Sequence, residues 1–399
     1  MSELLKLEIS ALATDGRGVA RDSDGRVVMV ENALTGERVA ANIIRVRKGY
    51  AEAACLDILA PSSQRVEPPC PYYGLCGGCD LQHLSYDGQQ QAKRQWLERA
   101  LRNLELPPLE TVASAALGYR HRLRLHFGAG GAGFYAKGSR ALVPVERCLL
   151  AADYANERWP EISAIDMPRL QEVEVLAGDN QLALQMLGHN LKPRQLAIEA
   201  IINWPGHMPD LESGITYYQE NGLRMQAYPG LFSQINWEVN RQLIKYLQEM
   251  LKPYLSKGPL LDLFAGSGNL SLPLAKMGAE VWAVEGVSGA VRAGRHLAES
   301  NNLPCRFVHQ PVEQFLNHCP ITPQTVVLDP PRSGAKGMVS AIIGLKPAAI
   351  AYVSCHPAAL ARDANEITQN GYALSRLLML DMFPQTSQVE ALALFTLAE

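Results

Sequence analysis

The last third of the chain alternates between short apolar runs and longer amphipathic segments. From Pro259 onward the apolar runs read PLLDLF, EVWAVE, CRFVH, TVVLDPP and AIAYVS, and segments of ordinary helical length separate them. This alternation predicts βαβ units that build a mostly parallel, doubly wound sheet with helices on both faces. Two further runs, YALSRLLMLDMF and EALALFTLA, close the chain as strands. Ligands of such sheets bind beyond the carboxyl ends of the strands, so residues at those ends are the candidates for a site.

A cysteine follows the last of the five runs. In AAIAYVSCHPAALARD, a buried strand around residues 350–353 is followed by a sharp turn at Cys355 and a helix from about Ala358. The positive end of that helix favours a thiolate, which indicates a reactive cysteine facing the cleft. Most unpaired cysteines are packing residues, so a buried structural cysteine stays open as the alternative for this stretch alone.

The stretch DLFAGSGNLSLPLA reads as a strand, a glycine turn and a helix. Gly266 and Gly268 let the backbone pass close to a ligand, and Glu285 ends the next strand, where a carboxylate can bind two ribose hydroxyls. The G-x-G-x-x-G fingerprint is absent because Phe264 holds its first glycine position, and no P-loop lysine follows. These features favour S-adenosylmethionine over NAD. In VVLDPPRSG, two prolines make a rigid strand exit that aims Asp329 into the cleft.

Polar residues precede a further helix, which begins at about Trp237. Phe232, Gln234 and Asn236 in FSQIN either reach a ligand or serve as cap and turn residues. Upstream, the stretch LGYRHRLRLHFG alternates basic and apolar residues, so a strand here has one basic face. Such a face suits RNA phosphates, and its alternative is salt bridging to acids elsewhere in the chain. The basic residues are Arg120, Arg122, Arg124 and His126.

Residues 1–60 contain short alternating runs separated by glycine turns. Five such strands in this length predict a small OB-like barrel, a shape often used to bind RNA. Arg45 and Arg47 lie on one strand face in a stretch without acids, which favours RNA contact over a merely solvated barrel face. The formal net charge of −3 gives no global indication of a nucleic-acid partner, so RNA binding must depend on local patches.

A proline-rich linker leads to three closely spaced cysteines in CPYYGLCGGCDLQH. Cys70, Cys76 and Cys79 have the spacing C-x5-C-x2-C, and Cys148 lies far along the chain. Four thiolates can bind a 4Fe–4S cluster or a structural zinc ion. One tight triplet with one distant cysteine favours iron–sulfur, because zinc sites more often show two CxxC pairs.

Size and hydropathy bound the remaining possibilities. A chain of 399 residues suits several domains, and we expect three, at 1–60, 61–225 and 226–399. No apolar run reaches membrane-spanning length, and MSELLKLEIS is not a secretory signal. We therefore expect a cytoplasmic protein with no membrane partner.

Taken together, the motifs resemble one enzyme family. FSQIN, DLFAGSGN, VVLDPPRSG, YVSCHPAALARD and FPQTSQVE are similar to motifs of the RNA 5-methyluridine methyltransferases. The front of the chain resembles the subgroup with a TRAM domain and a 4Fe–4S cluster, which modifies large-subunit ribosomal RNA. The resemblance implies a Rossmann-like α/β methyltransferase domain, a central α+β iron–sulfur domain and an amino-terminal TRAM barrel. It also implies methyl transfer from S-adenosylmethionine to carbon 5 of a uridine in RNA, with 23S ribosomal RNA preferred.

The resemblance also implies a role for particular residues. Cys355 matches the nucleophile, which bonds to carbon 6 of uracil, and Glu390 matches the general base. Five residues match positions that contact the cofactor or the target base: Gln234, Phe264, Asn269, Glu285 and Asp329. The cluster ligands correspond to Cys70, Cys76, Cys79 and Cys148.

Three positions depart from the family pattern. His356 stands where asparagine is usual, Gln388 where histidine is usual, and Pro311 where a polar group often contacts adenine. The alternatives are the same reaction on transfer RNA and an RNA-binding assembly factor with weak activity. A small-molecule methyltransferase is disfavoured, because it would have no use for the front barrel or the arginine face.

Overall fold

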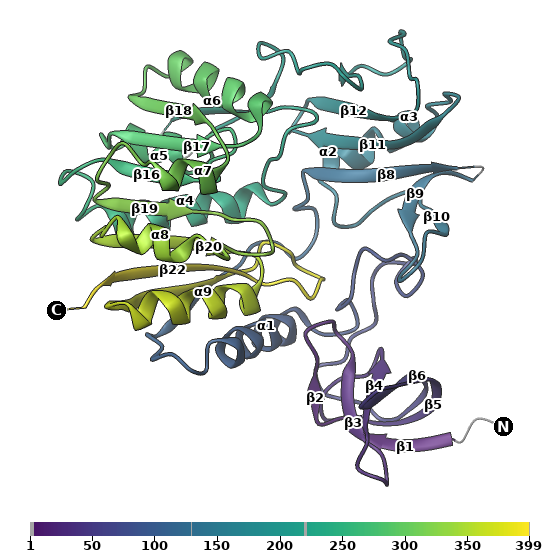
Figure 1. Cartoon of the computed structure of the whole chain (residues 1–399). Helices are drawn as coiled ribbons and strands as arrows, with labels where there is room; N and C mark the ends of the chain where they lie inside the picture. Colours follow the sequence, from purple (N-terminus) through teal and green to yellow (C-terminus); the bar gives the residue numbers. More distant parts are fainter. Residues whose placement is uncertain (1–3, 129, 219–221, 399) are drawn as a thin grey trace. The chain divides into compact units, whose positions relative to one another are not determined.

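The computed structural model of the chain describes residues 4–128, 130–218 and 222–398 (Figure 1). Its contacts group into two compact units. The first consists of Met1–Trp96, Tyr135–Ala141 and Phe383–Gln388, and the second of Leu97–Phe134, Leu142–Met382 and Val389–Glu399. Helix α1 (Tyr86–Ala100) begins in the first unit and ends in the second.

The first unit contains a six-stranded sheet in the order β1-β5-β6-β4-β3-β2. The sequence runs indicate five strands, and the structure adds a sixth, the two-residue strand β2, which follows β1 after Ile9 and Ser10. Alternate side chains of these strands form a core that includes Ile9, Val28 and Val39. Beyond the sheet, the linker is attached to it because the Arg65 guanidinium donates to the fully buried Glu37 carboxylate. The strands are β1 (Leu4–Glu8), β2 (Ala11–Leu12), β3 (Gly18–Arg21), β4 (Val27–Glu31), β5 (Arg38–Arg47) and β6 (Tyr50–Ala60).

A second six-stranded sheet, of order β10-β9-β8-β11-β12-β13, carries the basic strand. Strand β8 (Arg122–Gly128) pairs with β11 (Leu170–Ala177), and the basic side chains face acids on β11. Arg122 donates to Glu174 at 2.8 Å, and Arg124 lies 3.4 Å from the same carboxylate. The basic face of β8 therefore forms salt bridges to acids within the chain, the alternative to phosphate binding. Glu172 and Glu174 on β11 neutralise most of its charge. The other elements here are β9 (Gly131–Tyr135), β10 (Leu142–Pro144), α2 (Asp153–Glu157), α3 (Trp159–Ser163), β12 (Leu182–Gly188) and β13 (Ile201–Asn203).

The second unit also contains an eight-stranded sheet of order β18-β17-β16-β19-β20-β22-β21-β7. Strands β16, β17, β18, β19 and β20 are parallel, as the alternating pattern predicts, and helices lie on both faces (Figure 1). The order runs outward in both directions from β16 and β19, so the switch point of the sheet lies between them. Its strands are β7 (Leu109–Val112), β16 (Leu260–Leu263), β17 (Val281–Glu285), β18 (Cys305–His309), β19 (Thr325–Leu328), β20 (Ala349–Ser354), β21 (Tyr372–Leu380) and β22 (Glu390–Leu397).

The strands at the centre of this sheet are buried along their whole length, which explains their unbroken apolar sequence. The helices between them are α5 (Ser271–Lys276), α6 (Ser288–Ser300), α7 (Val312–Asn317), α8 (Val339–Gly344) and α9 (Pro357–Gln369). Helix α4 (Trp237–Leu251) precedes β16, and the hairpin of β14 (Ile215–Tyr218) and β15 (Arg224–Ala227) lies upstream of it in sequence. Across the residues that are described, no helix is both long and apolar enough to span a bilayer.

Candidate active site

Five of the candidate side chains lie at one edge of the eight-stranded sheet. Phe264, Asp329 and Cys355 directly follow parallel strands β16, β19 and β20, and Glu285 is the last residue of β17. Strand β22 runs antiparallel to β20, so its first residue, Glu390, lies at the same edge. The fold therefore collects residues that are distant in sequence at the carboxyl ends of the strands.

The nucleophile and base candidates lie at the end of one β-ladder, that of β20 and β22. Ser354 pairs with Ala391, and continuing this antiparallel register by one residue places Cys355 beside Glu390. Residues directly opposite each other in such a ladder have Cα atoms about 4.5–5.5 Å apart. The two side chains can thus act on the two faces or adjacent atoms of one small ring.

The Cys355 thiol is half-buried, and its surroundings oppose ionisation. Burial, followed by the negative charges of Glu390 and Asp329, raises its pKa to about 11, although the Arg332 cation and a backbone hydrogen bond act to lower that pKa. The expected thiolate is therefore disfavoured in the free protein. The start of helix α9 at Pro357 is where the sequence indicates it, but burial and two carboxyl groups outweigh its positive end.

Two carboxyl groups share this edge and disfavour each other's ionisation. Burial raises the pKa of Asp329 to about 6. Burial and the charge of Asp329 raise the pKa of Glu390 well above its usual range, and the Glu390 side chain is only 3% exposed. Two buried carboxyls in proximity resist carrying two negative charges, so this pair retains a proton at pH values where exposed acids are ionised.

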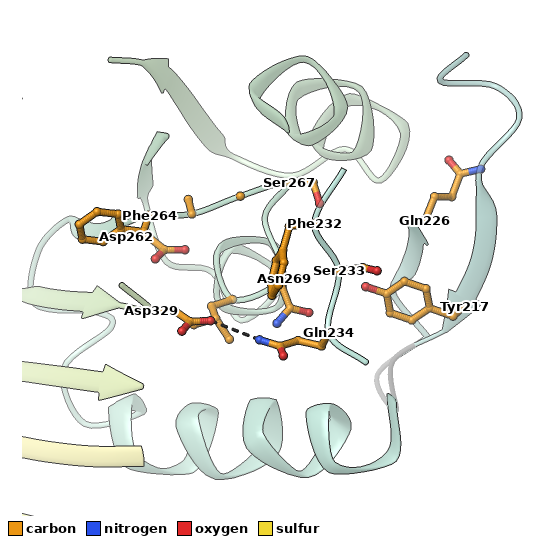
Figure 2. Close-up of a pocket in the computed structure, with 13 residues that line it drawn as sticks. Tyr217, Gln226, Phe232, Ser233, Gln234, Asp262, Phe264, Ser267, Asn269 and Asp329 are labelled. Carbon is orange, nitrogen blue, oxygen red and sulfur yellow. Dashed lines mark hydrogen bonds between the residues drawn. The ribbon is translucent and has the colours of Figure 1, made fainter. Parts of the chain in front are cut away.

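In the FSQIN segment, Gln234 contacts Asp329 at the edge of the sheet, and Asn236 caps helix α4. The Gln234 amide donates to Asp329 at 3.3 Å (Figure 2). Asn236 instead caps helix α4 and accepts from the Val239 amide, so its alternative interpretation as a cap residue is confirmed. Phe232 is 62% exposed, and the Arg122 guanidinium lies 5.3 Å from its ring centre.

The glycine turn after β16 forms a pocket with Phe232, Gln234 and Asp329 (Figure 2). Phe264 has a φ of 63°, an unusual conformation for a bulky residue, and it turns the chain sharply after β16. The Gly266 amide donates to Glu285 at 3.0 Å, which joins the turn to the neighbouring strand. Asn269 exchanges two amide hydrogen bonds with Asn240 of α4, at 2.8 and 2.9 Å, which fixes its orientation.

Asp262 is a pocket residue that the sequence reasoning missed. It lies within β16, is 1% exposed and lines the same pocket. Ser271 donates to one of its carboxylate oxygens, and the other has no partner among the described residues. Burial raises the pKa of Asp262 to about 7. The available signal was a single acid inside the apolar run LLDLF, because a buried carboxyl requires partners that an apolar strand does not supply.

Comparisons with known proteins agree with this geometry. The family described as TRAM domain matches residues 3–56, and the one described as tRNA (Uracil-5-)-methyltransferase matches residues 216–317 and 316–397. A protein of Chromohalobacter salexigens named 23S rRNA (uracil(1939)-C(5))-methyltransferase RlmD is 35% identical, over 98% of this chain and 89% of its own length. The Vibrio campbellii protein of the same name is also 35% identical, over 98% of this chain and 95% of its own. The chain belongs to the RNA uracil-C5 methyltransferase family.

A solved structure shows the same fold over the full length. The crystal structure of Pyrococcus abyssi tRNA (uracil-54, C5)-methyltransferase in complex with S-adenosyl-L-homocysteine has a TM-score of 0.78. It covers 99% of this chain and 100% of its own, at 23% identity. The expected Rossmann-like fold is thus confirmed, and S-adenosylmethionine is the methyl donor of this family.

A buried carboxylate on helix α9 binds the loop that follows the DPPR motif at Asp329. Asp363 on α9 is fully buried, accepts from the Ala335 amide at 2.8 Å and from the Tyr352 hydroxyl at 2.6 Å. The neighbouring Arg362 bonds both to Asp363 and to the Ser333 carbonyl. The sequence reasoning assigned no role to Arg362 and Asp363, which end the motif segment ALARD.

The three departures from the family pattern have simple local settings. His356 is the N-cap of α9, and its Nδ1 accepts from the Ala359 amide at 3.2 Å, which is the interaction that an asparagine cap makes. Pro311 precedes helix α7 and serves as its N-cap without a side-chain bond. The backbone N–H of Gln388 donates to the Thr386 hydroxyl at 3.3 Å.

The four cysteines predicted to bind a cluster are divided between the two units. Cys70, Cys76 and Cys79 belong to the first unit and Cys148 to the second. In the described part of the chain, no group of three or more His, Cys, Asp or Glu side chains is arranged to hold a metal ion. Thiolate sites assemble together with their metal, so the cysteines need the bound group to converge. The structure therefore gives the cluster no support of its own.

Proposed function

We propose that this chain methylates carbon 5 of a uridine in 23S ribosomal RNA, with Cys355 as nucleophile and Glu390 as base. The observation that supports the proposal is the β20–β22 register, whose last pair is Ser354 and Ala391, so that Cys355 and Glu390 are the next residue along each strand. The names of the relatives support the ribosomal substrate, because they specify uracil 1939 of 23S rRNA.

Carbon 5 of uracil is too weak a nucleophile to take a methyl group unaided. As the Cys355 sulfur bonds to carbon 6, the thiol proton passes to the neighbouring Asp329 carboxylate, the ring becomes an enolate and carbon 5 becomes nucleophilic. S-adenosylmethionine supplies the methyl group as a sulfonium. Glu390 then removes the proton from carbon 5, the carbon–sulfur bond breaks, and the thiolate leaves with the ring double bond restored.

The raised pKa of Glu390 suits this role. A carboxylate with a high pKa is a stronger base than an exposed glutamate, and its burial keeps water from competing for the proton. Glu390 must be ionised to remove the proton from carbon 5. The negative charge of Asp329 opposes this ionisation because it raises the pKa of Glu390. We propose that hydrogen bonds from the uracil edge to Gln234 and Asp329 change this charge balance when RNA binds.

The pocket residues fit the cofactor. Glu285 accepts backbone hydrogen bonds through both oxygens and retains lone pairs for the two ribose hydroxyls. The free oxygen of Asp262 can accept from the α-ammonium group of the cofactor, and Phe264 and Asn269 line the wall. The Phe264 ring offers an apolar surface to adenine.

The target base must leave its stack to reach this pocket, so we propose a looped or single-stranded region of the RNA as substrate. We further propose three domains: the TRAM barrel over 1–60, a central domain over 61–225 and the methyltransferase domain over 226–399. The exposed Arg45 and Arg47 of the barrel are candidates to contact the RNA backbone. A ribosomal substrate implies that the enzyme works in the cytoplasm.

The decisive experiment maps 5-methyluridine in RNA from cells with and without this protein. Ribosomal and transfer RNA are purified separately, and complementation uses wild type and Cys355→Ala. We expect one ribosomal uridine to lose its methyl group and only the wild type to restore it. Loss confined to transfer RNA would assign the other substrate, and restoration by Cys355→Ala would exclude the covalent mechanism.

We also propose that Cys70, Cys76, Cys79 and Cys148 bind a 4Fe–4S cluster with a structural role. The support is the C-x5-C-x2-C spacing with one distant cysteine and the resemblance of the front of the chain to the cluster-containing subgroup. Methyl transfer as written above has no redox step, so no catalytic role is needed. Protein purified without oxygen should be brown and contain iron. Stoichiometric zinc in colourless protein would reverse the choice of metal.

A further inference from the structure

A second pocket lies beside the cofactor pocket and is not used by the chemistry above. It measures about 610 Å³, within the range of about 300–1,000 Å³ that small-molecule sites occupy. Tyr217 lines both pockets. The FSQIN segment also connects them, because Phe232 and Gln234 line the first pocket, and Trp237, one residue after the segment, lines the second.

Three stacked rings form part of its wall. The rings of His121 and Trp237 are 3.9 Å apart and parallel within 4°, and Tyr217 stacks on the same indole at 4.8 Å. Burial lowers the pKa of His121, so its ring is neutral and the stack carries no charge at neutral pH. Aromatic walls of this kind accept unstacked nucleobases.

Two guanidinium groups line the same pocket. Arg224 is exposed, and its guanidinium forms no hydrogen bond or ion pair with another described residue. Arg241 on the first turns of α4 pairs with Glu238 and still borders the pocket. Asp179 is the only carboxylate in the described lining, and it can accept from the exocyclic amine of a base. Glu238 balances the charge of Arg241, so the exposed Arg224 is the guanidinium best placed to contact a phosphate.

We propose that this pocket binds a second unstacked nucleotide of the RNA, close in sequence to the methylated uridine. Its base lies against the His121–Trp237–Tyr217 wall, and its phosphate contacts Arg224 and Arg241. The inference depends on the proposed function, which places the target base near Gln234 and Asp329 of the first pocket, and Tyr217 lines both that pocket and this one. Selection of the correct uridine would then depend on two bases and not on one.

The test combines abasic RNA with arginine variants. The probe is the ribosomal RNA fragment that carries the mapped uridine, with single abasic replacements at each neighbouring position. For wild type, one abasic position should weaken binding about tenfold, within the range for loss of one stacked base. Arg224→Ala should weaken binding to intact RNA, and the same abasic replacement should then cost less than about threefold, because both changes remove one contact.

Two matched variants separate this site from general charge effects. Arg292→Ala removes an exposed arginine of α6, and should leave both the affinity and the abasic profile unchanged. Glu238→Ala removes the ion-pair partner of Arg241 while keeping its guanidinium in place, and should not weaken binding. Fully additive effects of Arg224→Ala and the abasic replacement would overturn the proposal, as would an abasic profile with no sensitive position.

Methylation of intact RNA is measured in the same samples. If wild type methylates the fragment while the abasic profile is flat, only the second-nucleotide site is wrong. If wild type methylates no RNA at all, the proposed function itself fails and takes this inference with it.

Discussion

The surroundings of Cys355 change its thiol pKa in the opposite direction from the one that the sequence predicts. A cysteine at a strand end before a helix predicts a thiolate, yet burial and two carboxyl neighbours raise its pKa to about 11. The reacting form is therefore scarce in the free protein at neutral pH. Ionisation of the thiol therefore requires a change in the neighbouring charges or the binding of RNA. The reactivity of the Cys355 sulfur reports either change.

Alkylation of the free protein should show this directly. The thiolate reacts and the thiol does not, so the iodoacetamide rate at Cys355 should rise about tenfold per pH unit from pH 7 towards 10. Asp329→Asn removes a nearby negative charge, lowers the thiol pKa and should raise the rate at pH 8 about threefold or more. Arg332→Ala should lower it. Peptide mass spectrometry separates Cys355 from the other cysteines, and a rate independent of pH would contradict the protonated thiol.

Glu390→Gln should trap the enzyme on its substrate. An amide cannot take the proton from carbon 5, so the carbon–sulfur bond to Cys355 cannot break after methyl transfer. We expect a protein–RNA band that survives a denaturing gel and turnover reduced about a hundredfold or more. Cys355→Ala combined with Glu390→Gln is the control and should give no such band. Full turnover by Glu390→Gln would assign the base to another group.

At the scale of elements, the carboxyl-terminal helix holds the loop that shapes the site. Asp363 on α9 binds the Tyr352 hydroxyl of β20 and the Ala335 amide of the DPPR loop, so a helix, a strand and a loop share one buried carboxylate. A Cβ on Gly334 would lie 2.5 Å from this carboxylate, which explains a glycine with a φ of 72° at this point. The position of Asp329 therefore depends on residues that do not line the pocket.

Tyr352→Phe tests this connection. It removes the hydroxyl that donates to Asp363 and should cost about 1–3 kcal/mol of unfolding free energy, measured by urea denaturation. Tyr372→Phe is matched to it, because the buried Tyr372 hydroxyl also donates one hydrogen bond, at 2.7 Å, to the Pro347 carbonyl. We expect similar stability losses, but only Tyr352→Phe should lower kcat/KM. Equal activity of the two variants would mean that the loop needs no such support.

At the scale of the whole molecule, RNA affinity must come from local charge. The net charge is −3, and much of the basic strand is neutralised by Glu172 and Glu174. The exposed Arg45 of the barrel has no partner recorded among the described residues, whereas Arg124 lies within 3.6 Å of two glutamates. Arginines that look alike in the sequence therefore differ in the charge they offer to phosphate.

Salt titrations of RNA binding should separate the two kinds of arginine. Each phosphate contact adds about 0.7 to the slope of log affinity against log salt for single strands. Arg45→Ala should lower the slope by about that amount, and Arg124→Ala by distinctly less, because its charge is already neutralised. Equal decreases would show that RNA displaces the glutamates from the basic strand.

The sequence predicted the parallel sheet and the residues at its edge because both follow from local periodicity. Apolar runs identify buried strands, and their ends identify Glu285, Asp329 and Cys355 as candidates. Pairing between distant segments was not visible: neither the acids of β11 opposite Arg122 nor the stack around Trp237 follows from any local pattern. Asp262 and Asp363 were missed for the same reason, since a buried carboxyl is recognised by partners that tertiary structure brings to it.

The antiparallel last strand has a consequence for how such enzymes can diversify. The distance between Cys355 and Glu390 is set by hydrogen bonds between two neighbouring strands, whose axes lie about 4.8 Å apart. Insertions or deletions in loops elsewhere should leave that distance unchanged, because Glu390 is the first residue of β22 and Cys355 directly follows β20. One reaction centre can thus be combined with new recognition surfaces, and an engineer seeking a different target RNA would rebuild those surfaces while keeping the two strands.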